Sequence, residues 1–260
     1  MHQARKRFGQ NFLVDEGIIE QIVSTIAPRA SDVMVEIGPG LGALTGPLLA
    51  RIPHLNVVEI DRDLVERLKR RFSPSQLTIH EGDALQFDFA RLGAPLRVVG
   101  NLPYNISTPL LFHLAEFAGS IQDMLFMLQK EVVDRMVAEP DSPAYGRLSV
   151  MLQYRFEVAS LFDVPPSAFR PAPKVTSSIV WLKPRPASAL NATDEAVLSR
   201  VVSAAFGQRR KTLRNCLAGL VPDGGFVETG IDPGARGEKL AVADYVRLAN
   251  WCAAQGAPRA

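Results

Sequence analysis

The sequence predicts an α/β fold, a doubly wound and mostly parallel sheet, with a small all-helical domain at the C-terminal end. Three observations predict it. Short apolar runs alternate with segments of helical spacing over about the first two hundred residues. A stretch rich in Pro, Ala and Ser at 184–192 interrupts the alternation. After it, apolar residues recur only at near-helical spacing, at Leu198, Val201, Val202, Ala205, Phe206, Leu213 and Leu217.

The strands and helices are expected in alternating order. Each expected strand is a short apolar run, at 33–37, 55–60, 77–80, 96–100 and 124–128. The segments 44–51, 63–71 and 108–118 between them have helical spacing, and Asp63 is a suitable N-cap for the second. Alternation of this kind is typical of a parallel sheet whose ligands bind beyond the carboxyl ends of the strands.

Length and composition fit an enzyme with one large and one small domain. The chain has 260 residues, of which 47% are hydrophobic and 22% charged, so it can bury a sizeable core. We expect a catalytic domain at 1–185, including a basic N-terminal arm, and a small helical domain at 186–260. No apolar run is long enough to cross a bilayer and no signal-peptide core follows the N-terminus, which predicts a cytoplasmic protein. The two cysteines, Cys216 and Cys252, and the four scattered histidines suggest neither a disulfide nor a metal site.

Glycine or polar residues follow four successive expected strands. These residues are Gly38, Glu59, Asp83 and Asn101. Because the carboxyl ends of parallel strands meet at one edge of a sheet, the four positions predict a binding site there. An Asp at the third exit can accept a hydrogen bond from the exocyclic amine of a cofactor adenine.

The glycine-rich segment at 36–42 allows two interpretations. Gly38, Gly40 and Ala43 satisfy the dinucleotide pattern G-x-G-x-x-G/A, and Glu59 lies 21 positions after Gly38, where a nicotinamide enzyme binds a ribose. The same residues also read as E-x-G-x-G-x-G beginning at Glu36. The Asp and Asn at the later strand exits favour the second reading over a Rossmann dehydrogenase.

The tetrapeptide Asn101-Leu102-Pro103-Tyr104 can hold an amino group attached to a flat ring. Asn101 supplies a side-chain carbonyl, and Pro103 sets Leu102 in an extended conformation so that its backbone carbonyl can point the same way. Tyr104 supplies a stacking face. Two acceptors beside an aromatic ring predict a pocket for an adenine or cytosine amine, although a proline turn with a core tyrosine has the same sequence.

The net charge of +2 is unevenly distributed. Residues 1–12 contain three basic side chains and no acid, and residues 181–260 contain 11 basic and 7 acidic side chains, a net charge of +4. The rest of the chain, residues 13–180, has 15 basic and 20 acidic side chains, a net charge of −5. This pattern indicates a polyanionic partner held from two sides, or ordinary surface variation.

Several motifs occur along the chain that have no generic reason to occur together. They are the glycine loop and the segments 5–13, 101–107, 126–131, 145–150, 164–175 and 208–215. With these motifs the chain resembles the KsgA/RsmA family of small-subunit (16S) ribosomal RNA adenine dimethyltransferases. The resemblance is collinear from about residue 5 to beyond residue 215.

This resemblance implies a Rossmann-like methyltransferase that uses S-adenosyl-L-methionine. It implies N6,N6-dimethylation of two adjacent adenosines near the 3′ end of the small-subunit (16S) ribosomal RNA, in ribosome biogenesis. By position, the cofactor-binding residues would be Asn11, Leu13, Gly38, Gly40, Glu59, Asp83 and Asn101. Two of these residues have alternative roles that do not involve the cofactor. Leu13 could be a core residue, and Asn11 could be the cap of a helix that begins near Asp15.

Catalysis and RNA binding are expected from further residues. Asn101, Leu102 and Tyr104 would orient the target amine without deprotonating it, and Phe169 would stack on the flipped base opposite Tyr104, unless Phe169 is a core anchor. We expect one helix of the C-terminal domain to carry four basic residues, Arg209, Arg210, Lys211 and Arg214. The RNA-binding residues would be Arg5, Lys6, Arg7, Arg147, Lys174, Arg209, Arg210, Lys211 and Arg214.

Other functions remain open at this level. One is a related adenine methyltransferase that acts on large-subunit ribosomal RNA or on DNA, although the segments 8–11 and 208–211 favour the small-subunit type. Another is a factor that chiefly assists assembly of the small ribosomal subunit. We expect a monomer that binds no membrane and no metal.

Overall fold

The structure, a computed structural model, describes residues 11–103 and 106–256, and these form two compact units. The first unit comprises the described residues up to Val133 together with Val158–Pro184. The second comprises Asp134–Glu157 and the described residues from Arg185 on. The second unit therefore contains a segment that the sequence placed in the large domain. Each unit is built around its own hydrophobic core.

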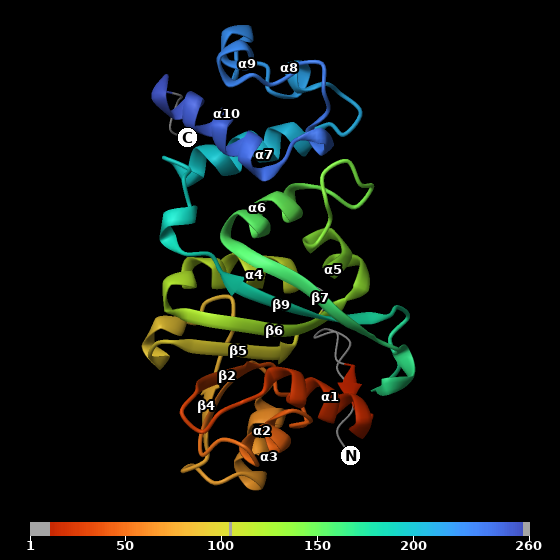
Figure 1. The fold of residues 1–260 in the computed structure, drawn as a ribbon. Helices are drawn as coiled ribbons and strands as arrows, with labels where there is room; N and C mark the ends of the chain where they lie inside the picture. Colours follow the sequence, from red (N-terminus) through yellow and green to blue (C-terminus); the bar gives the residue numbers. More distant parts are fainter. Residues whose placement is uncertain (1–10, 104–105, 257–260) are drawn as a thin grey trace. The chain divides into compact units, whose positions relative to one another are not determined.

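A seven-stranded sheet forms the centre of the first unit (Figure 1). Its strand order is β4-β3-β2-β5-β6-β9-β7, and β9 is antiparallel to β6 whereas β4, β3, β2, β5 and β6 run parallel to one another. The strands are β2 (Val33–Ile37), β3 (Leu55–Glu59), β4 (Leu77–Glu81), β5 (Leu96–Asn101), β6 (Ile121–Gln129), β7 (Phe156–Val164) and β9 (Ser177–Pro184). The predicted mostly parallel sheet and its five apolar strands are confirmed.

The order of the strands reverses direction beside β2. The chain runs from β2 outward to β3 and β4 and then returns to β5 on the other side of β2. This creates a crevice at the carboxyl ends of β2 and β5, which is where open α/β sheets bind ligands. The two strands lie close together there, because a Cβ atom at Gly100 would lie 2.5 Å from the Ile37 carbonyl oxygen. Only glycine is accommodated at this position.

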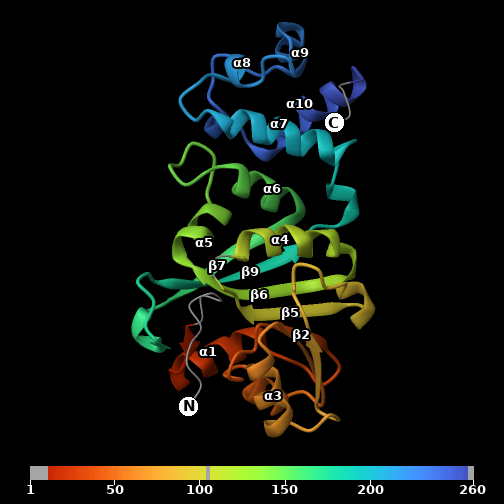
Figure 2. The ribbon, with the colours of Figure 1, turned by 180° about the vertical axis from the view of Figure 1, so that it is seen from behind.

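Helices pack against both faces of the sheet. Figures 1 and 2 view the ribbon from opposite sides and show α1 and α4 on opposite faces. On the α1 face, Ile22, Val23 and Ile26 pack with alternate strand residues such as Val57 and Val99 in one buried cluster. The helices are α1 (Glu16–Ile26), α2 (Thr45–Leu49), α3 (Arg62–Arg71) and α4 (Ser107–Glu116), and α5 (Lys130–Met136) continues from this unit into the second.

Two helix caps differ from the sequence predictions. The cap of α3 is Asp61, which has an extended backbone and accepts a hydrogen bond from the Asp63 N–H at 3.0 Å. The prediction of Asp63 was wrong because that residue lies inside the first helical turn. Asp15 caps α1 by accepting from the Ile18 N–H, so the alternative role of Asn11 as a cap is excluded.

A short two-stranded sheet joins the N-terminal segment to the loop after β7. Its strands are β1 (Phe12–Leu13) and β8 (Phe169–Arg170), and they pair antiparallel with Phe12 opposite Arg170 and Leu13 opposite Phe169. The Val14 N–H continues this connection by donating to the Ala168 carbonyl at 2.8 Å. The pairing fixes residues 12–13 on the first unit.

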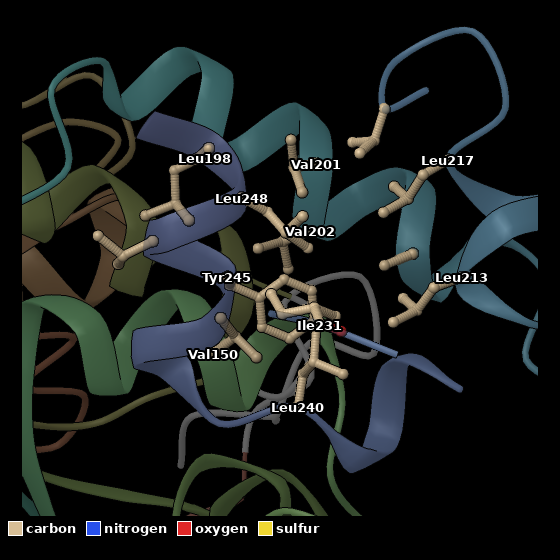
Figure 3. Close-up of a cluster of buried hydrophobic side chains, with 14 of the residues drawn as sticks. Val150, Leu198, Val201, Val202, Leu213, Leu217, Ile231, Leu240, Tyr245 and Leu248 are labelled. Atoms are coloured by element: carbon tan, nitrogen blue, oxygen red, sulfur yellow. The ribbon is translucent and has the colours of Figure 1, made fainter. Parts of the chain in front are cut away.

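The second unit consists of helices around a separate core. The buried cluster in Figure 3 includes Val150 of α6, Val201 and Val202 of α7, and Tyr245 and Leu248 of α10. Because Val150 packs with α7 and α10, the segment 134–157 joins this unit. The helices are α6 (Arg147–Arg155), α7 (Glu195–Gly207), α8 (Leu213–Cys216), α9 (Asp223–Thr229) and α10 (Val242–Ala254).

Helix α7 ends earlier than the sequence predicts. Its last residue is Gly207, and Gln208 leaves the helical conformation with φ −135° and ψ 82°. Arg209, Arg210 and Lys211 therefore lie in a turn, and only Arg214 lies in a helix, α8. The prediction of one helix for these four residues was wrong. No described helix is long and apolar enough to span a membrane.

Candidate active site at the strand exits

The four strand exits that the sequence singled out line one cavity. The cavity has a volume of about 300 Å³ and lies within the first unit. Gly38, Glu59, Asp83 and Asn101 all line it, as the topology of the sheet requires. A volume of this size suits a small-molecule ligand.

The glycine loop after β2 shapes one wall of the cavity. Gly38 and Gly40 have φ values of +66° and +59°, in the left-handed region that favours glycine. The Gly38 N–H donates to the Val58 carbonyl at 2.9 Å, which fixes the loop to β3. A Cβ atom at Gly40 would lie 3.3 Å from the Phe12 ring. The loop therefore approaches the N-terminal segment closely.

Glu59, the last residue of β3, connects this loop to the next helix. One carboxylate oxygen accepts from the Gly40 N–H at 3.3 Å, and the other accepts from the Asp61 N–H at 2.9 Å. The side chain is buried, and this burial raises the pKa of Glu59 although both hydrogen bonds act in the opposite direction. The Gly40 N–H, which a nucleotide phosphate would need as a donor, is thus already bound to the Glu59 carboxylate.

Glu36 is a second buried carboxyl group in the cavity wall. It lies in β2, and one of its oxygens accepts a hydrogen bond from the Thr45 hydroxyl at 2.6 Å. Burial, with a smaller contribution from the nearby charge of Glu59, raises the pKa of Glu36 to about 7. This carboxyl group can therefore gain or lose a proton near neutral pH.

Asp83 and Asn101 present oxygen acceptors from the other two exits. The Oδ1 atom of Asp83 accepts from the Leu85 N–H at 2.9 Å, which fixes the orientation of the carboxylate. The side-chain amide of Asn101 donates from Nδ2 to the Asn11 carbonyl at 3.3 Å. This bond fixes the amide group and leaves its carbonyl oxygen as the acceptor that the sequence predicted.

The segment after Asn101 is only partly described. The Leu102 N–H donates to the Met127 carbonyl at 3.2 Å, and the Leu102 side chain is buried. Pro103 lines the cavity with Leu102. Tyr104 lies outside the described residues, so its stacking role stays a prediction.

Residues 11–13 of the N-terminal segment form part of the cavity wall. Asn11 and Leu13 both line it, together with Phe12 between them. Leu13 is also buried in the core cluster, which agrees with its alternative role, and its contact with the cofactor stays a prediction. The β1–β8 pairing holds this wall in place.

Phe169 does not line the cavity in this structure. Its side chain is 1% exposed and packs in the same core cluster as Leu13, its partner in the β1–β8 pair. A ring buried to this extent offers no face to a base, so the structure places Phe169 in the alternative role of a core anchor. The stacking role would require the ring to leave the core, and it stays a prediction.

The charge of the cavity wall distinguishes between the two interpretations of the glycine loop. Three carboxyl side chains, those of Glu36, Glu59 and Asp83, line the cavity, whereas no described Lys, Arg or His does. Carboxylates repel a pyrophosphate and attract a cation. The wall therefore disfavours a dinucleotide and favours a positively charged ligand.

The comparisons with known proteins agree with this chemistry. A family model described as ribosomal RNA adenine dimethylase matches residues 1–254. The chain belongs to the ribosomal RNA adenine dimethylase family. As a member of this family, it is a methyltransferase that uses S-adenosylmethionine.

Relatives of this dimethylase cover nearly its whole length. A protein of Aromatoleum aromaticum named ribosomal RNA small subunit methyltransferase A is 68% identical over all of this chain and 97% of its own. A protein of the same name from Dechloromonas aromatica is 61% identical over 96% and 98% of the two chains.

Two solved structures share the fold. A dimethyladenosine transferase from Plasmodium falciparum is 26% identical with a TM-score of 0.80, covering 91% of this chain and 95% of the other. The 23S rRNA methyltransferase ErmE is also 26% identical, with a TM-score of 0.70 over 94% and 100% of the two chains. The predicted methyltransferase fold is confirmed.

The cavity of the dimethylase fits its cofactor. S-adenosylmethionine carries a sulfonium and an ammonium group against a single carboxylate, so it is positively charged overall. The wall complements this charge because its described ionisable side chains are all carboxyl groups. In addition, the partly exposed side chains of Leu41 and Ile60 line the cavity and offer apolar contact to a flat ring.

The candidate RNA-binding residues of the dimethylase differ in their partners. In the second unit, Arg209 pairs with Glu238 at 3.5 Å and Arg214 pairs with Asp223 at 3.1 Å. Arg210 and Lys211 are exposed, and within the described part of the chain their side chains make no hydrogen bond or ion pair. These two residues are therefore the strongest candidates for phosphate contact.

The remaining candidates for RNA contact are distributed over the chain. Arg147 is exposed at the start of α6, and Lys174 is exposed in the loop between β8 and β9. Arg5, Lys6 and Arg7 lie outside the described residues. No three His, Cys, Asp or Glu residues in 11–103 and 106–256 are grouped so that they could hold a metal ion.

Several residues of the cavity wall were not predicted from the sequence. Glu36 was noted only as part of a motif, and Phe12, Leu41 and Ile60 were not singled out. Ile60 follows directly after the acid at a strand exit, and this position was the available signal. The sequence contained no comparable signal for Leu41 and Phe12, because their positions in the cavity wall depend on the conformation of the loop.

Proposed function

We propose that this dimethylase transfers methyl groups to the N6 atoms of two adjacent adenosines near the 3′ end of the small-subunit ribosomal RNA. The observation that carries the proposal is the fixed acceptor of Asn101 inside a cavity lined by carboxyl groups. The names of the relatives that are 68% and 61% identical support the small subunit as the source of the substrate.

The cofactor would be held by the residues at the strand exits. Glu59 would accept hydrogen bonds from ribose hydroxyls, and Asp83 from an adenine amine. The loop at Gly38 and Gly40 would bring the backbone close to the amino-acid end of the cofactor. When bound, the cofactor supplies an electrophilic methyl group.

Asn101 would orient the nitrogen that receives the methyl group. An adenine amine is a weak nucleophile because its lone pair is delocalised into the ring. Acceptors from the Asn101 side chain and the Leu102 carbonyl would bind the two N–H groups and favour a pyramidal nitrogen. Because this orientation restricts the motion of the reacting groups, it can supply several kcal/mol of the barrier.

A strong base is not required at this position. The nitrogen loses its proton readily once it has been alkylated, so the neutral side chain of Asn101 is sufficient. The two carboxyl groups nearest the glycine loop, those of Glu36 and Glu59, have other hydrogen-bond partners. The chemistry is therefore governed by position and by the charge of the wall.

The target base must leave its stack to enter the cavity, which costs a few kcal/mol and least in single-stranded RNA. Tyr104 would stack on the flipped base. Arg210 and Lys211 would contact phosphates, and such contacts make RNA binding sensitive to salt. We also propose that the protein acts as a monomer and that residues 186–260 are the RNA-contacting domain.

The experiment that tests the proposal is transfer of labelled methyl groups to small ribosomal subunits that lack the modification. The modified nucleotides are then identified by mass spectrometry, with the Asn101→Ala variant as a matched control. We expect dimethyladenosine at two adjacent positions near the 3′ end, and none with the variant. Label in any other nucleotide would contradict the proposal.

The neighbour ErmE defines the alternative outcome. Its title describes a 23S rRNA methyltransferase, and its fold also matches this chain. Presenting unmethylated large subunits in a parallel reaction separates the two substrates. Preferential labelling of the large subunit would replace the proposal with that alternative.

A further inference from the structure

The third glycine of the loop does not serve the cavity. Gly38, Pro39, Gly40, Leu41 and Ala43 line the cavity, whereas Gly42 is absent from its wall. Gly42 nevertheless has a φ of +81°, in the left-handed region. This backbone conformation already favours glycine, and the space beside Gly42 on the side of Arg71 gives a second reason for the lack of a side chain.

The guanidinium group of Arg71 occupies the space beside this glycine. A Cβ atom at Gly42 would lie 3.2 Å from Nη1 of Arg71, and a Cβ atom at Gly46 would lie 3.2 Å from Nη2. Both distances are shorter than ordinary van der Waals contact. Two glycines, one in the loop and one in α2, thus leave room for one side chain.

Arg71 is fixed in this space by two further contacts. Its Nη1 atom donates to the Leu41 carbonyl at 2.9 Å. Its guanidinium carbon lies 5.0 Å from the centre of the Phe72 ring, within the range of a cation–π contact. Arg71 is the last residue of α3, so these contacts join the end of that helix to the glycine loop.

A second connection joins the start of the same helix to the loop. Asp61 caps α3, and its N–H also donates to Glu59, whose other oxygen accepts from Gly40. The N-cap of α3 is therefore linked to Gly40 through Glu59, and the last residue of the helix contacts Leu41 directly. Gly40 and Leu41 are neighbours in the loop, and both line the cavity.

We propose that Arg71 is a positioning residue for the cofactor, which holds the glycine loop in its binding conformation without contacting the cofactor. The proposal rests on the cofactor site proposed above. A loop with three residues at positive φ gains much conformational freedom when it is released. Without Arg71, part of the binding energy of the cofactor is spent on ordering Leu41 and its neighbours.

The first test compares the Arg71→Ala and Arg71→Lys variants with the control Arg70→Ala. Arg70 is also exposed on α3, but its Nε atom donates to the Glu66 carbonyl within the helix. For Arg71→Ala we expect KM for S-adenosylmethionine to rise about three- to tenfold with kcat nearly unchanged, as loss of one charged hydrogen bond acting indirectly would give. Arg71→Lys should restore part of the affinity, and Arg70→Ala should leave it unchanged.

The second test uses Gly46 to displace Arg71 without removing it. The Gly46→Ala substitution adds a methyl group at the guanidinium, so it should raise KM for the cofactor by a similar factor. In the Arg71→Ala background, the same substitution should have no further effect, because nothing remains to be displaced. Additive effects of the two substitutions would overturn the proposal.

Direct binding of S-adenosylhomocysteine, measured by calorimetry, separates failure of this proposal from failure of the site. The control is Glu59→Gln, which changes a residue in the wall of the cavity. If Glu59→Gln weakens binding and Arg71→Ala does not, Arg71 has no positioning role. If neither substitution weakens binding, the cofactor site itself is wrong. A merely structural role would show as a lower kcat and a lower melting temperature of Arg71→Ala together with its higher KM. That outcome would also overturn the proposal.

Discussion

The cavity at the strand exits and the turn between α7 and α8 hold charged groups in opposite ways. In the cavity, the carboxyl groups of Glu36 and Glu59 are buried and hydrogen-bonded to protein donors. In the turn, the basic side chains of Arg210 and Lys211 are exposed and, within the described residues, make no hydrogen bond or ion pair.

The difference indicates which kind of ligand each region can bind. Buried acids with fixed orientations suit a small cation of defined shape, because they need no rearrangement when it binds. Exposed cations suit a polyanion of variable shape, whose affinity depends on salt. Under the proposed function, one chain would bind a methyl donor and an RNA by two distinct physical means. The predictions below test this contrast.

The largest expected effect concerns the stability of the core behind the cavity, which contains Phe169. Phe169→Ala removes a fully buried ring beside Leu13 and should lower the free energy of unfolding by about 3–5 kcal/mol. Arg210→Ala, in the exposed turn, should change it by less than about 0.5 kcal/mol. Urea denaturation measures both. A stable Phe169→Ala variant that has lost methylation would show instead that the ring serves as a stacking surface.

The next effect concerns the rate of methyl transfer. Asn101→Ala removes the fixed acceptor and should lower kcat by about 10²- to 10³-fold, as loss of one preorganised hydrogen-bonding group does in other enzymes. The affinity for S-adenosylhomocysteine should fall by less than about tenfold. A loss of affinity as large as the loss of rate would assign Asn101 to cofactor binding alone.

The first and second methyl transfers place different demands on Asn101, since the monomethylated nitrogen has one N–H fewer to donate. We hypothesise that a neutral acceptor lowers the cost of leaving one acceptor unpaired. Asn101→Asp should therefore raise the ratio of monomethylated to dimethylated adenosine, measured by mass spectrometry. Unchanged product ratios would contradict the hypothesis.

The buried acid Glu36 predicts a dependence of stability on pH. Its pKa of about 7 in the folded protein exceeds its ordinary value of 4.5, so the folded state retains a proton that the unfolded chain releases between these values. The associated stability is present below pH 4.5 and is lost as the pH rises through 7. Glu36→Gln cannot ionise and should gain about 3 kcal/mol relative to the original protein between pH 4 and pH 8. Thermal melting at both pH values measures this gain, and an equal difference at both would exclude it.

The smallest effect concerns the turn. Replacing both Arg210 and Lys211 with Ala should lower the slope of log affinity against log salt by about 1–2, as loss of two phosphate contacts would. The matched control replaces Arg209 and Arg214, which are paired with Glu238 and Asp223, and should change the slope less. Equal changes in the two double variants would show that the ion pairs do not distinguish these residues.

The sequence predicted the elements of the fold well because the sheet is patterned locally. Apolar runs are sufficient to indicate the strands, and parallel topology brings Gly38, Glu59, Asp83 and Asn101 to one edge. The predicted cap of α3 was wrong by two positions. Asp61 and Asp63 are both suitable capping residues, and only the backbone conformation distinguishes them.

The remaining details depend on contacts between distant parts of the chain. The segment 134–157 joins the second unit because Val150 packs against α7 and α10, and no local pattern reports that packing. Phe169 is buried because β8 pairs with β1, which lies more than a hundred residues earlier. The basic residues after Gly207 have helical composition, and the end of α7 is set by Gln208.

The most direct test of the contrast measures both affinities in both regions. Calorimetry with S-adenosylhomocysteine and filter binding of a ribosomal RNA fragment are applied to Glu59→Gln and to the Arg210→Ala, Lys211→Ala double variant. We expect Glu59→Gln to weaken only the cofactor analogue and the double variant to weaken only the RNA. If either variant weakens both ligands to the same extent, the division of the two tasks between the cavity and the turn is contradicted.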